Sequence, residues 1–199
     1  MKGLLKYMKK KDEVVRILSR GGIVIFPTDT AYGIGCRVDN PKAVKKLFQI
    51  RKRPVDQAVP VLVSGKQMAK QYLKDLPKEI EDLMDKYWPG ALTVVYYCQN
   101  DKVSALVMGD NDTLGLRMPS YPELLSVIEA LGIPILGPSA NFHGKKTPFK
   151  KKDLDPNLLQ LVDYFWDDQP LGSGLTSTVI DCTKKPWQIL RQGAVNVDL

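Results

Sequence analysis

Histidine is nearly missing from this sequence. Among 199 residues only His143 is a histidine, so a zinc site built from several histidines is excluded. A Ser-His-Asp or Cys-His catalytic arrangement would have to use that one ring, which lies in a loop of glycine and lysine. We therefore expect chemistry that does not depend on histidine, and no metal site held by the protein.

Cysteine pairs and long apolar runs are missing as well. The three cysteines contain no CxxC pair, which is typical of reduced thiols in the cytosol. A membrane-spanning helix needs about 20 consecutive apolar residues, and no run approaches that length. The lysine-rich start is not followed by the apolar core of a signal peptide. These absences predict a cytoplasmic protein that does not bind a membrane.

The usual glycine-rich nucleotide motifs are absent too. The chain has neither GxxxxGK[ST] nor GxGxxG. An ATP site in this protein would therefore have to be built from cationic and hydroxyl side chains rather than from a phosphate-binding loop.

The overall composition is that of a globular domain with a positive net charge. Hydrophobic residues make up 44% of the chain and charged residues 26%, and 29 Lys and Arg against 22 Asp and Glu give a net charge of +7. A domain usually has about 100–200 residues, so we predict one domain over residues 1–199. The positive charge favours an anionic partner.

Apolar runs that end at turn residues alternate with helical periodicity, which is typical of an α/β domain. Because some strands are joined by short turns, we expect a sheet of mixed parallel and antiparallel strands. The predicted strands cover residues 22–26, 59–63, 91–97, 114–118, 133–137, 179–182 and 188–191.

Helices are expected between these strands. Asn40-Pro41 supplies a cap and a helix-starting proline before the apolar residues Val44, Leu47 and Phe48. A second helix is predicted over residues 78–87. Ser120 and Glu123 form a capping-box pattern for a third helix, which would bury Leu124, Leu125, Ile128 and Leu131.

Polar clusters lie at the ends of these elements, where open α/β sheets tend to bind ligands. They are Thr28-Asp29-Thr30, Arg51-Lys52-Arg53-Pro54, Ser139-Ala140-Asn141 and Ser177-Thr178. The first could be only a hydrogen-bonded turn and the second only a solvated helix end. The basic segment 138–152 is too long for a plain connector and is a candidate functional loop.

Two arginines, Arg117 and Arg191, lie near the ends of apolar strands. Burial would require a partner for each charge. That partner is either an anionic ligand or an internal carboxylate such as Asp29 or Asp181.

The order of these clusters resembles the YrdC/Sua5 family, the threonylcarbamoyl-AMP synthases, from about residue 21 to residue 193. The resemblance is carried by Pro27-Thr-Asp-Thr-Ala-Tyr-Gly-Ile-Gly35, Arg51-Lys-Arg-Pro54, Trp88-Pro-Gly-Ala-Leu-Thr93, Gly115-Leu-Arg-Met-Pro119, Pro138-Ser-Ala-Asn141, Ser177-Thr-Val-Ile-Asp181 and Leu190-Arg191-Gln-Gly193. It implies a twisted, open mixed sheet with flanking helices and a concave basic face.

The resemblance also implies a reaction. L-threonine, bicarbonate or CO2, and ATP with Mg²⁺ give threonylcarbamoyl-AMP and pyrophosphate, and partner proteins transfer the threonylcarbamoyl group to adenosine 37 of tRNA. Such a step relies mainly on alignment of the substrates and stabilisation of charge, which agrees with clusters rich in Arg, Ser and Thr.

Site residues follow from the resemblance position by position. It implies threonine-binding residues Thr30, Arg117, Gly137 and Ser177, ATP-binding residues Arg53, Gln57, Thr113, Ser139, Thr147 and Arg191, and the catalytic signature Arg51, Arg53, Ser139 and Asn141. Arg51 replaces the lysine of the family pattern, which keeps the charge on a bulkier, forked group. Leu62 stands where some members have a histidine that contacts threonine.

Two alternatives stay open. The lysines of segment 138–152 could follow the phosphate backbone of double-stranded RNA or tRNA, which would make this an RNA-binding protein. A paralogue of the YciO type would share the fold but have weak or different activity.

Overall fold

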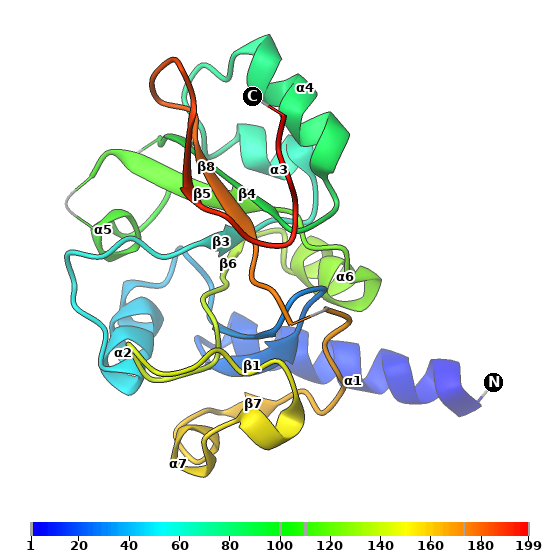
Figure 1. Ribbon diagram of the computed structural model, residues 1–199. Helices are drawn as coiled ribbons and strands as arrows, with labels where there is room; N and C mark the ends of the chain where they lie inside the picture. Colours follow the sequence, from blue (N-terminus) through cyan, green and yellow to red (C-terminus); the bar gives the residue numbers. More distant parts are fainter. Residues whose placement is uncertain (1, 100, 110, 173, 199) are drawn as a thin grey trace.

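A computed structural model describes residues 2–99, 101–109, 111–172 and 174–198; the five remaining positions of the predicted domain lie outside it. In this part of the chain two β-sheets are flanked by helices (Figure 1). One sheet has six strands in the order β6-β3-β5-β4-β8-β9, and the other has three in the order β2-β1-β7. The prediction of an α/β fold with mixed strand directions is confirmed.

The six-stranded sheet holds most of the predicted strands. They are β3 (Val61–Leu62), β4 (Leu92–Tyr97), β5 (Thr113–Arg117), β6 (Ile135–Leu136), β8 (Thr178–Asp181) and β9 (Gln188–Arg191). The pairs β3·β5 and β4·β8 are parallel, and the others are antiparallel. The strand predicted over 59–63 is reduced to β3, because the Val59 amide donates instead to the carbonyl of Val107 in another loop.

The three-stranded sheet contains β1 (Val24–Pro27), β2 (Tyr32–Gly35) and β7 (Tyr164–Phe165). Strand β2 was not predicted, because glycine has a low strand propensity. Its glycines are needed where other groups approach closely: a Cβ on Gly33 would collide with the Phe26 ring, and one on Gly35 with the carbonyl oxygen of Leu136.

This close approach gives a first prediction. Gly35→Ala should lower the free energy of unfolding by about 2–4 kcal/mol, because backbone rather than a flexible side chain would have to move. Gly65→Ala is the matched control: Gly65 has extended backbone and no atom within 4 Å of the added Cβ, so a change below about 0.5 kcal/mol is expected. Urea unfolding of both variants measures the difference. Equal stability of the two would refute the packing role of Gly35.

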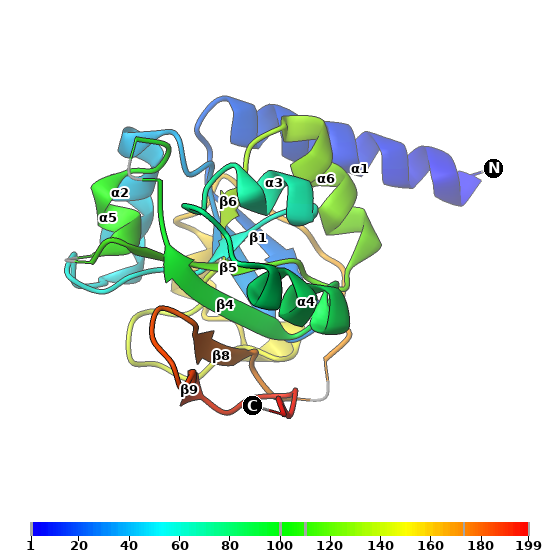
Figure 2. The same cartoon turned by 90° about the horizontal axis from the view of Figure 1, so that it is seen from above.

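Helix α1 (Lys2–Ser19) is the longest helix and was not predicted. It lies beside α6 (Pro122–Leu131), as both views of the ribbon show (Figures 1 and 2). Val14 and Leu18 of α1 pack in a cluster with Leu124 and Ile128 of α6. The single buried stripe is enough to hold a helix whose other faces are charged.

The capping prediction for α2 (Pro41–Arg51) is confirmed, because Oδ1 of Asn40 accepts a hydrogen bond from the Ala43 amide at 3.1 Å. The capping box predicted for α6 is wrong. The residue at the cap is Tyr121, with no side-chain hydrogen bond to the helix, because Pro122 already takes the first helical position. Leu125 and Leu131 are only half-buried, and Val127 is buried in their place.

The remaining helices are short, apart from α4 (Lys78–Tyr87), which was predicted. They are α3 (Lys66–Lys70), α5 (Ala105–Met108), the 3-10 turn Lys151–Asp153 and α7 (Pro156–Leu159). Within the described ranges, no helix combines the length and apolar character needed to cross a bilayer. All three cysteines are free thiols, as predicted, and all three are buried. Burial raises the pKa of Cys36 to about 12.

The two sheets are joined along β2. The Ile34 amide donates to the carbonyl of Pro138, and the Leu136 amide donates to that of Cys36. Gly33 also forms a bridge with Ser139. The Thr28–Ala31 turn at one end of β2 and the segment after β6 are therefore held against the six-stranded sheet, and a cavity opens between them.

Candidate active site

The cavity has a volume of about 480 Å³ and is lined from both sheets and the loops between them. Most residues implied by the resemblance lie on its wall: Thr30, Arg51, Arg53, Thr113, Arg117, Gly137, Ser139, Thr147, Ser177 and Arg191. Gln57 and Asn141 do not. Residues more than 150 positions apart in the chain thus meet at one place, which is large enough for a small ligand.

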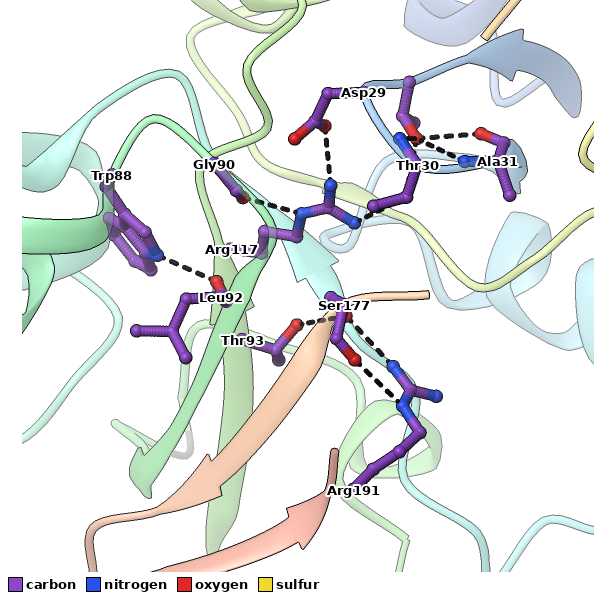
Figure 3. Close-up of polar contacts among 11 residues, drawn as sticks. Asp29, Thr30, Ala31, Trp88, Gly90, Leu92, Thr93, Arg117, Ser177 and Arg191 are labelled. Atoms are coloured by element: carbon purple, nitrogen blue, oxygen red, sulfur yellow. Dashed lines mark hydrogen bonds and ion pairs between the residues drawn. The ribbon is translucent and has the colours of Figure 1, made fainter. Parts of the chain in front are cut away.

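Arg117 at the end of β5 is 6% exposed and is held on three sides. Its Nε donates to the carbonyl of Gly90 at 3.0 Å, Nη1 to the Thr30 hydroxyl at 2.9 Å, and Nη2 to Oδ1 of Asp29 at 2.5 Å (Figure 3). The internal carboxylate is thus Asp29. A guanidinium has five N–H groups, so three are used by described residues and one on each terminal nitrogen remains for a ligand.

The Thr28–Ala31 turn supplies the hydroxyl that meets Arg117. Oγ1 of Thr28 accepts from the amides of Thr30 and Ala31 and lies 3.0 Å from the Thr30 hydroxyl. The cluster is therefore a hydrogen-bonded turn, and it also lines the cavity. The interpretation as a hydrogen-bonded turn is therefore confirmed, and the interpretation as a ligand-binding cluster stays a prediction.

Ser177, directly before β8, connects two other cavity residues. Its hydroxyl lies 2.9 Å from that of Thr93 and accepts a hydrogen bond from Nη2 of Arg191 at 2.9 Å (Figure 3). Nε of Arg191 also donates to the Ser177 carbonyl at 3.0 Å. Arg191 has no carboxylate partner among the described residues, so Asp181 does not neutralise it.

Arg51 at the end of α2 has a buried guanidinium, 3% exposed. Its Nε donates to the Asn141 carbonyl at 3.1 Å, whereas Nη1 has no partner among the described residues. Burial, and next the charge of Arg53, lower the pKa of Arg51 to about 10. The group is therefore still charged at neutral pH, and no carboxylate of the described part of the chain forms an ion pair with it.

The neighbours of Arg51 differ in orientation. Arg53 lines the cavity and donates to the carbonyls of Gln57 and Ala58 at 3.2 and 2.6 Å. Lys52 caps α2 in the left-handed conformation and lies over the ring of Phe142 instead, with 5.3 Å from Nζ to the centroid. A phosphate clamp that uses all three cations of the segment is thus not present in this arrangement.

Asn141 supports the wall from behind. Its Oδ1 accepts from the Ser139 hydroxyl, and its Nδ2 donates to the carbonyls of Phe142 and Lys145. The Ser139 hydroxyl lines the cavity, and Gly137 beside it leaves no room for a side chain because Leu62 fills that space.

Like charges meet in pairs at this cavity. The charge of Arg53 lowers the pKa of Arg51, and that of Arg117 lowers the pKa of Arg191, although burial is the larger cause in both. Arg117 is paired with Asp29, whereas Arg51, Arg53 and Arg191 have no carboxylate at ion-pair distance among the described residues. An anion bound in the cavity would stabilise these three charges. The arrangement therefore fits a ligand with at least two negative groups.

Some lining residues were not in the predicted set, among them Tyr32, Thr93 and Asn111. Tyr32 and Thr93 belong to motifs that carry the resemblance, so only their roles were missed. The Tyr32 hydroxyl donates to the Asp168 carbonyl, and burial raises the pKa of this tyrosine to about 12. No pattern in the sequence singles out Asn111.

The basic segment 138–152 forms part of the wall through Pro138, Ser139 and Thr147. His143 is exposed and does not line the cavity. Lys146, Lys150 and Lys152 border a separate shallow hollow, whereas Lys151 pairs with Asp167 at 2.7 Å. The described residues hold no group of three or more His, Cys, Asp or Glu side chains that could bind a metal ion.

Fold and cavity together define an α/β protein with a cavity between two sheets that is lined by arginine and hydroxyl side chains. The particular family is shown by comparison: the Sua5/YciO/YrdC model, described as "Telomere recombination", matches residues 16–193. The chain belongs to this family.

Named relatives agree with this assignment. The threonylcarbamoyl-AMP synthase of Bacillus subtilis is 34% identical over 92% of this chain and 53% of its own length. That of Xanthomonas campestris is 31% identical over 90% of this chain and 96% of its own length. Among solved structures, P. abyssi Sua5 with L-threonine is 31% identical, with a TM-score of 0.86 over 94% of this chain and 54% of that one. The chain thus spans about half the length of some relatives and nearly all of another.

E. coli YciO is also similar, with a TM-score of 0.83 and 24% identity over 94% of this chain and 90% of that one. This likeness concerns the fold.

Proposed function

We propose that this protein is an ATP-dependent L-threonylcarbamoyladenylate synthase, as the resemblance implies. L-threonine and bicarbonate form a carbamate and water, and a carbamate oxygen then attacks the α-phosphorus of ATP and displaces pyrophosphate. The observation that carries the proposal is the uncompensated charge of the cavity, above all the buried Nη1 of Arg51 without a partner. Relatives named as synthases support it.

The threonine end of the cavity is proposed at Arg117 and Ser177. Arg117 offers one free N–H on each terminal nitrogen, which suits the two oxygens of a carboxylate. Thr30 holds this guanidinium in place through its hydroxyl. Gly137 and Leu62 close this part of the wall, and Leu62 fits an apolar group of the ligand. The complex of P. abyssi Sua5 with L-threonine supports the ligand class.

The ATP end is proposed at Arg51, Arg53, Ser139, Thr147 and Arg191, with Thr113 nearby on β5. Arg51 and Arg53 would neutralise the phosphates, and hydroxyl groups would orient them. Arg191 lies between the two ends, because it contacts Ser177, and would face the α-phosphate. Gln57 has no lining side chain here and enters only through its carbonyl, which orients Arg53.

Mg²⁺ is proposed to enter with ATP as part of the substrate, bound through its phosphates. The residues proposed for the ATP end supply cations and hydroxyls, and Asp181 is a lone carboxylate on the same wall, with no cluster of three or more His, Cys, Asp or Glu side chains among the described residues; this lining fits phosphates better than a resident metal ion. The product, a mixed anhydride, would be consumed by partner proteins that transfer the threonylcarbamoyl group to tRNA.

The positions of the arginines and lysines favour a synthase over an RNA-binding protein, and the comparisons favour it over a YciO-type paralogue. The arginines without a carboxylate partner among the described residues line the cavity, whereas three of the lysines that could follow an RNA backbone, Lys146, Lys150 and Lys152, border a separate hollow. The relatives at 31–34% identity are named as synthases, and YciO is less similar.

The test is pyrophosphate release by the purified protein. We expect release that requires L-threonine, bicarbonate and MgATP together, with less than about one tenth of the rate when any of them is omitted. D-threonine is the matched control, because it has the same groups as L-threonine in the mirror-image arrangement and should not support release if the threonine end of the cavity recognises shape. Release independent of threonine would mark a different nucleotidase, and no release at all would disprove the assignment even with the fold correct.

A further inference from the structure

We propose that Thr93 is a positioning residue: its hydroxyl donates to Ser177 and so directs the Ser177 proton into the cavity, onto an oxygen of the threonine-derived ligand. The inference rests on the proposed function only in taking L-threonine as the ligand. In this proposal Thr93 acts on the ligand through Ser177.

The geometry places three hydroxyl and guanidinium groups in a row. Thr93 lies on β4, Ser177 precedes β8, and Arg191 ends β9, on three neighbouring strands of one sheet. Figure 3 shows Ser177 between Thr93 and Arg191. Thr93 is 2% exposed and Ser177 6%, so bulk water does not compete freely for these hydrogen bonds.

The direction of the hydrogen bonds follows from counting protons. A guanidinium can only donate, so Arg191 occupies one lone pair of the Ser177 oxygen. Thr93 has no other hydrogen-bond partner for its hydroxyl among the described residues. Both hydroxyls line the cavity, but Thr93 is the less exposed of the two. If Ser177 donated to Thr93, this less exposed hydroxyl would hold its proton without a protein acceptor, which is the costlier arrangement. Thr93 therefore donates, and Ser177 accepts twice.

A serine oxygen with both lone pairs occupied can act only as a donor. The Ser177 proton then points away from Thr93 and Arg191 and into the cavity that Ser177 lines. A hydroxyl with a fixed proton recognises an anionic oxygen and binds it without the entropy cost of fixing a rotor. Thr93 thereby converts Ser177 from an ambiguous hydroxyl into a fixed donor.

The packing of Thr93 allows a clean test. Its methyl group faces Gly115, where an added Cβ would lie 3.4 Å away. Thr93→Val keeps the shape and removes the hydroxyl, whereas Thr93→Ser keeps the hydroxyl and removes the methyl group. The two variants therefore separate hydrogen bonding from packing.

The experiment is titration calorimetry of L-threonine into the wild type and both variants, with thermal unfolding to confirm that each is folded. We expect Thr93→Val to raise the Kd for L-threonine about tenfold, the effect of one hydrogen bond, and Thr93→Ser to change it less than about threefold. In a Ser177→Ala background Thr93→Val should add less than about twofold.

Equal effects of the two Thr93 variants would overturn the inference, as would a tenfold effect that persists without the Ser177 hydroxyl. The binding measurement does not need turnover. A protein that binds threonine in the expected pattern but releases no pyrophosphate would disprove the proposed synthase and leave the role of Thr93 standing. A wild type that does not bind L-threonine would overturn both.

Discussion

Arg51→Met should raise the melting temperature of the protein and at the same time abolish its pyrophosphate release. Arg51 is a buried charge that makes one hydrogen bond to the described residues, from Nε, and its Nη1 has no partner among them. Replacing such a group by an apolar side chain of similar length is often stabilising by about 1–4 kcal/mol, and each kcal/mol corresponds to about 2–4 °C for a chain of this size. The same change removes the charge proposed to meet the phosphates, so the rate should fall at least about 100-fold.

Two further variants make this prediction specific. Arg51→Lys keeps the charge and has the side chain that the family pattern carries at this position, so its rate should stay within about tenfold of the wild type. Arg37→Met is the matched control, because this guanidinium pairs with Asp39 at 2.6 Å and does not line the cavity. It should leave the rate unchanged and lower stability by less than about 1 kcal/mol. Differential scanning fluorimetry and the pyrophosphate assay together decide the matter. An Arg51→Met protein that is less stable and still active would show that Arg51 is a structural residue.

The stability contribution of Arg51 also has a defined dependence on pH. Its pKa in the folded protein is lowered to about 10 from 12.5, so the charged group destabilises the fold at every pH below about 10. The destabilisation is relieved only as pH rises from about 10 toward 12.5. Between pH 6 and pH 9 the stability difference between Arg51→Met and the wild type should therefore stay constant, within the error of urea unfolding.

The sequence predicts the elements of the six-stranded sheet better than those of the three-stranded sheet, for a physical reason. Strand β4 is a largely apolar run, and in β5 the buried Leu114 and Leu116 alternate with half-buried residues. Both patterns are recognised as strands from the sequence alone. Strand β2 consists of alternating glycines because the Phe26 ring and the Leu136 carbonyl occupy the space beside it. That requirement arises from the tertiary structure and cannot be read from local propensity.

Most of the predicted site residues line the cavity, whereas the charge balance of the cavity was not predictable. The arginines were marked by their place at strand ends, but the sequence does not reveal which is neutralised within the protein. Arg117 finds Asp29, whereas Arg191 has no carboxylate partner among the described residues, and Lys52 turns to Phe142 because its backbone adopts the left-handed cap of α2. Such differences depend on distances between residues far apart in the chain.

Substitutions in the ion pair between Arg117 and Asp29 should separate the stability of the fold from the binding of threonine. The side chains are 7% and 11% exposed, and removing one partner of a buried pair costs about 3–5 kcal/mol. Arg117→Ala should therefore destabilise the fold by about that amount, because Asp29 is left unpaired, and should raise the KM for L-threonine at least about 100-fold. Asp29→Asn should also destabilise the fold, yet keep the KM within about tenfold, because the guanidinium that meets the carboxylate remains.

The double variant Asp29→Asn, Arg117→Met separates the two effects. With both charges gone the fold should recover most of the stability lost in Arg117→Ala, since an uncompensated charge no longer lies in the interior. Threonine-dependent turnover should stay absent, because no cation remains at the Thr30 hydroxyl to hold the substrate carboxylate. Urea unfolding and the threonine dependence of pyrophosphate release measure the two quantities. A double variant that regains both would show that Arg117 serves only to neutralise Asp29, and the proposed threonine end of the cavity would have to lie elsewhere.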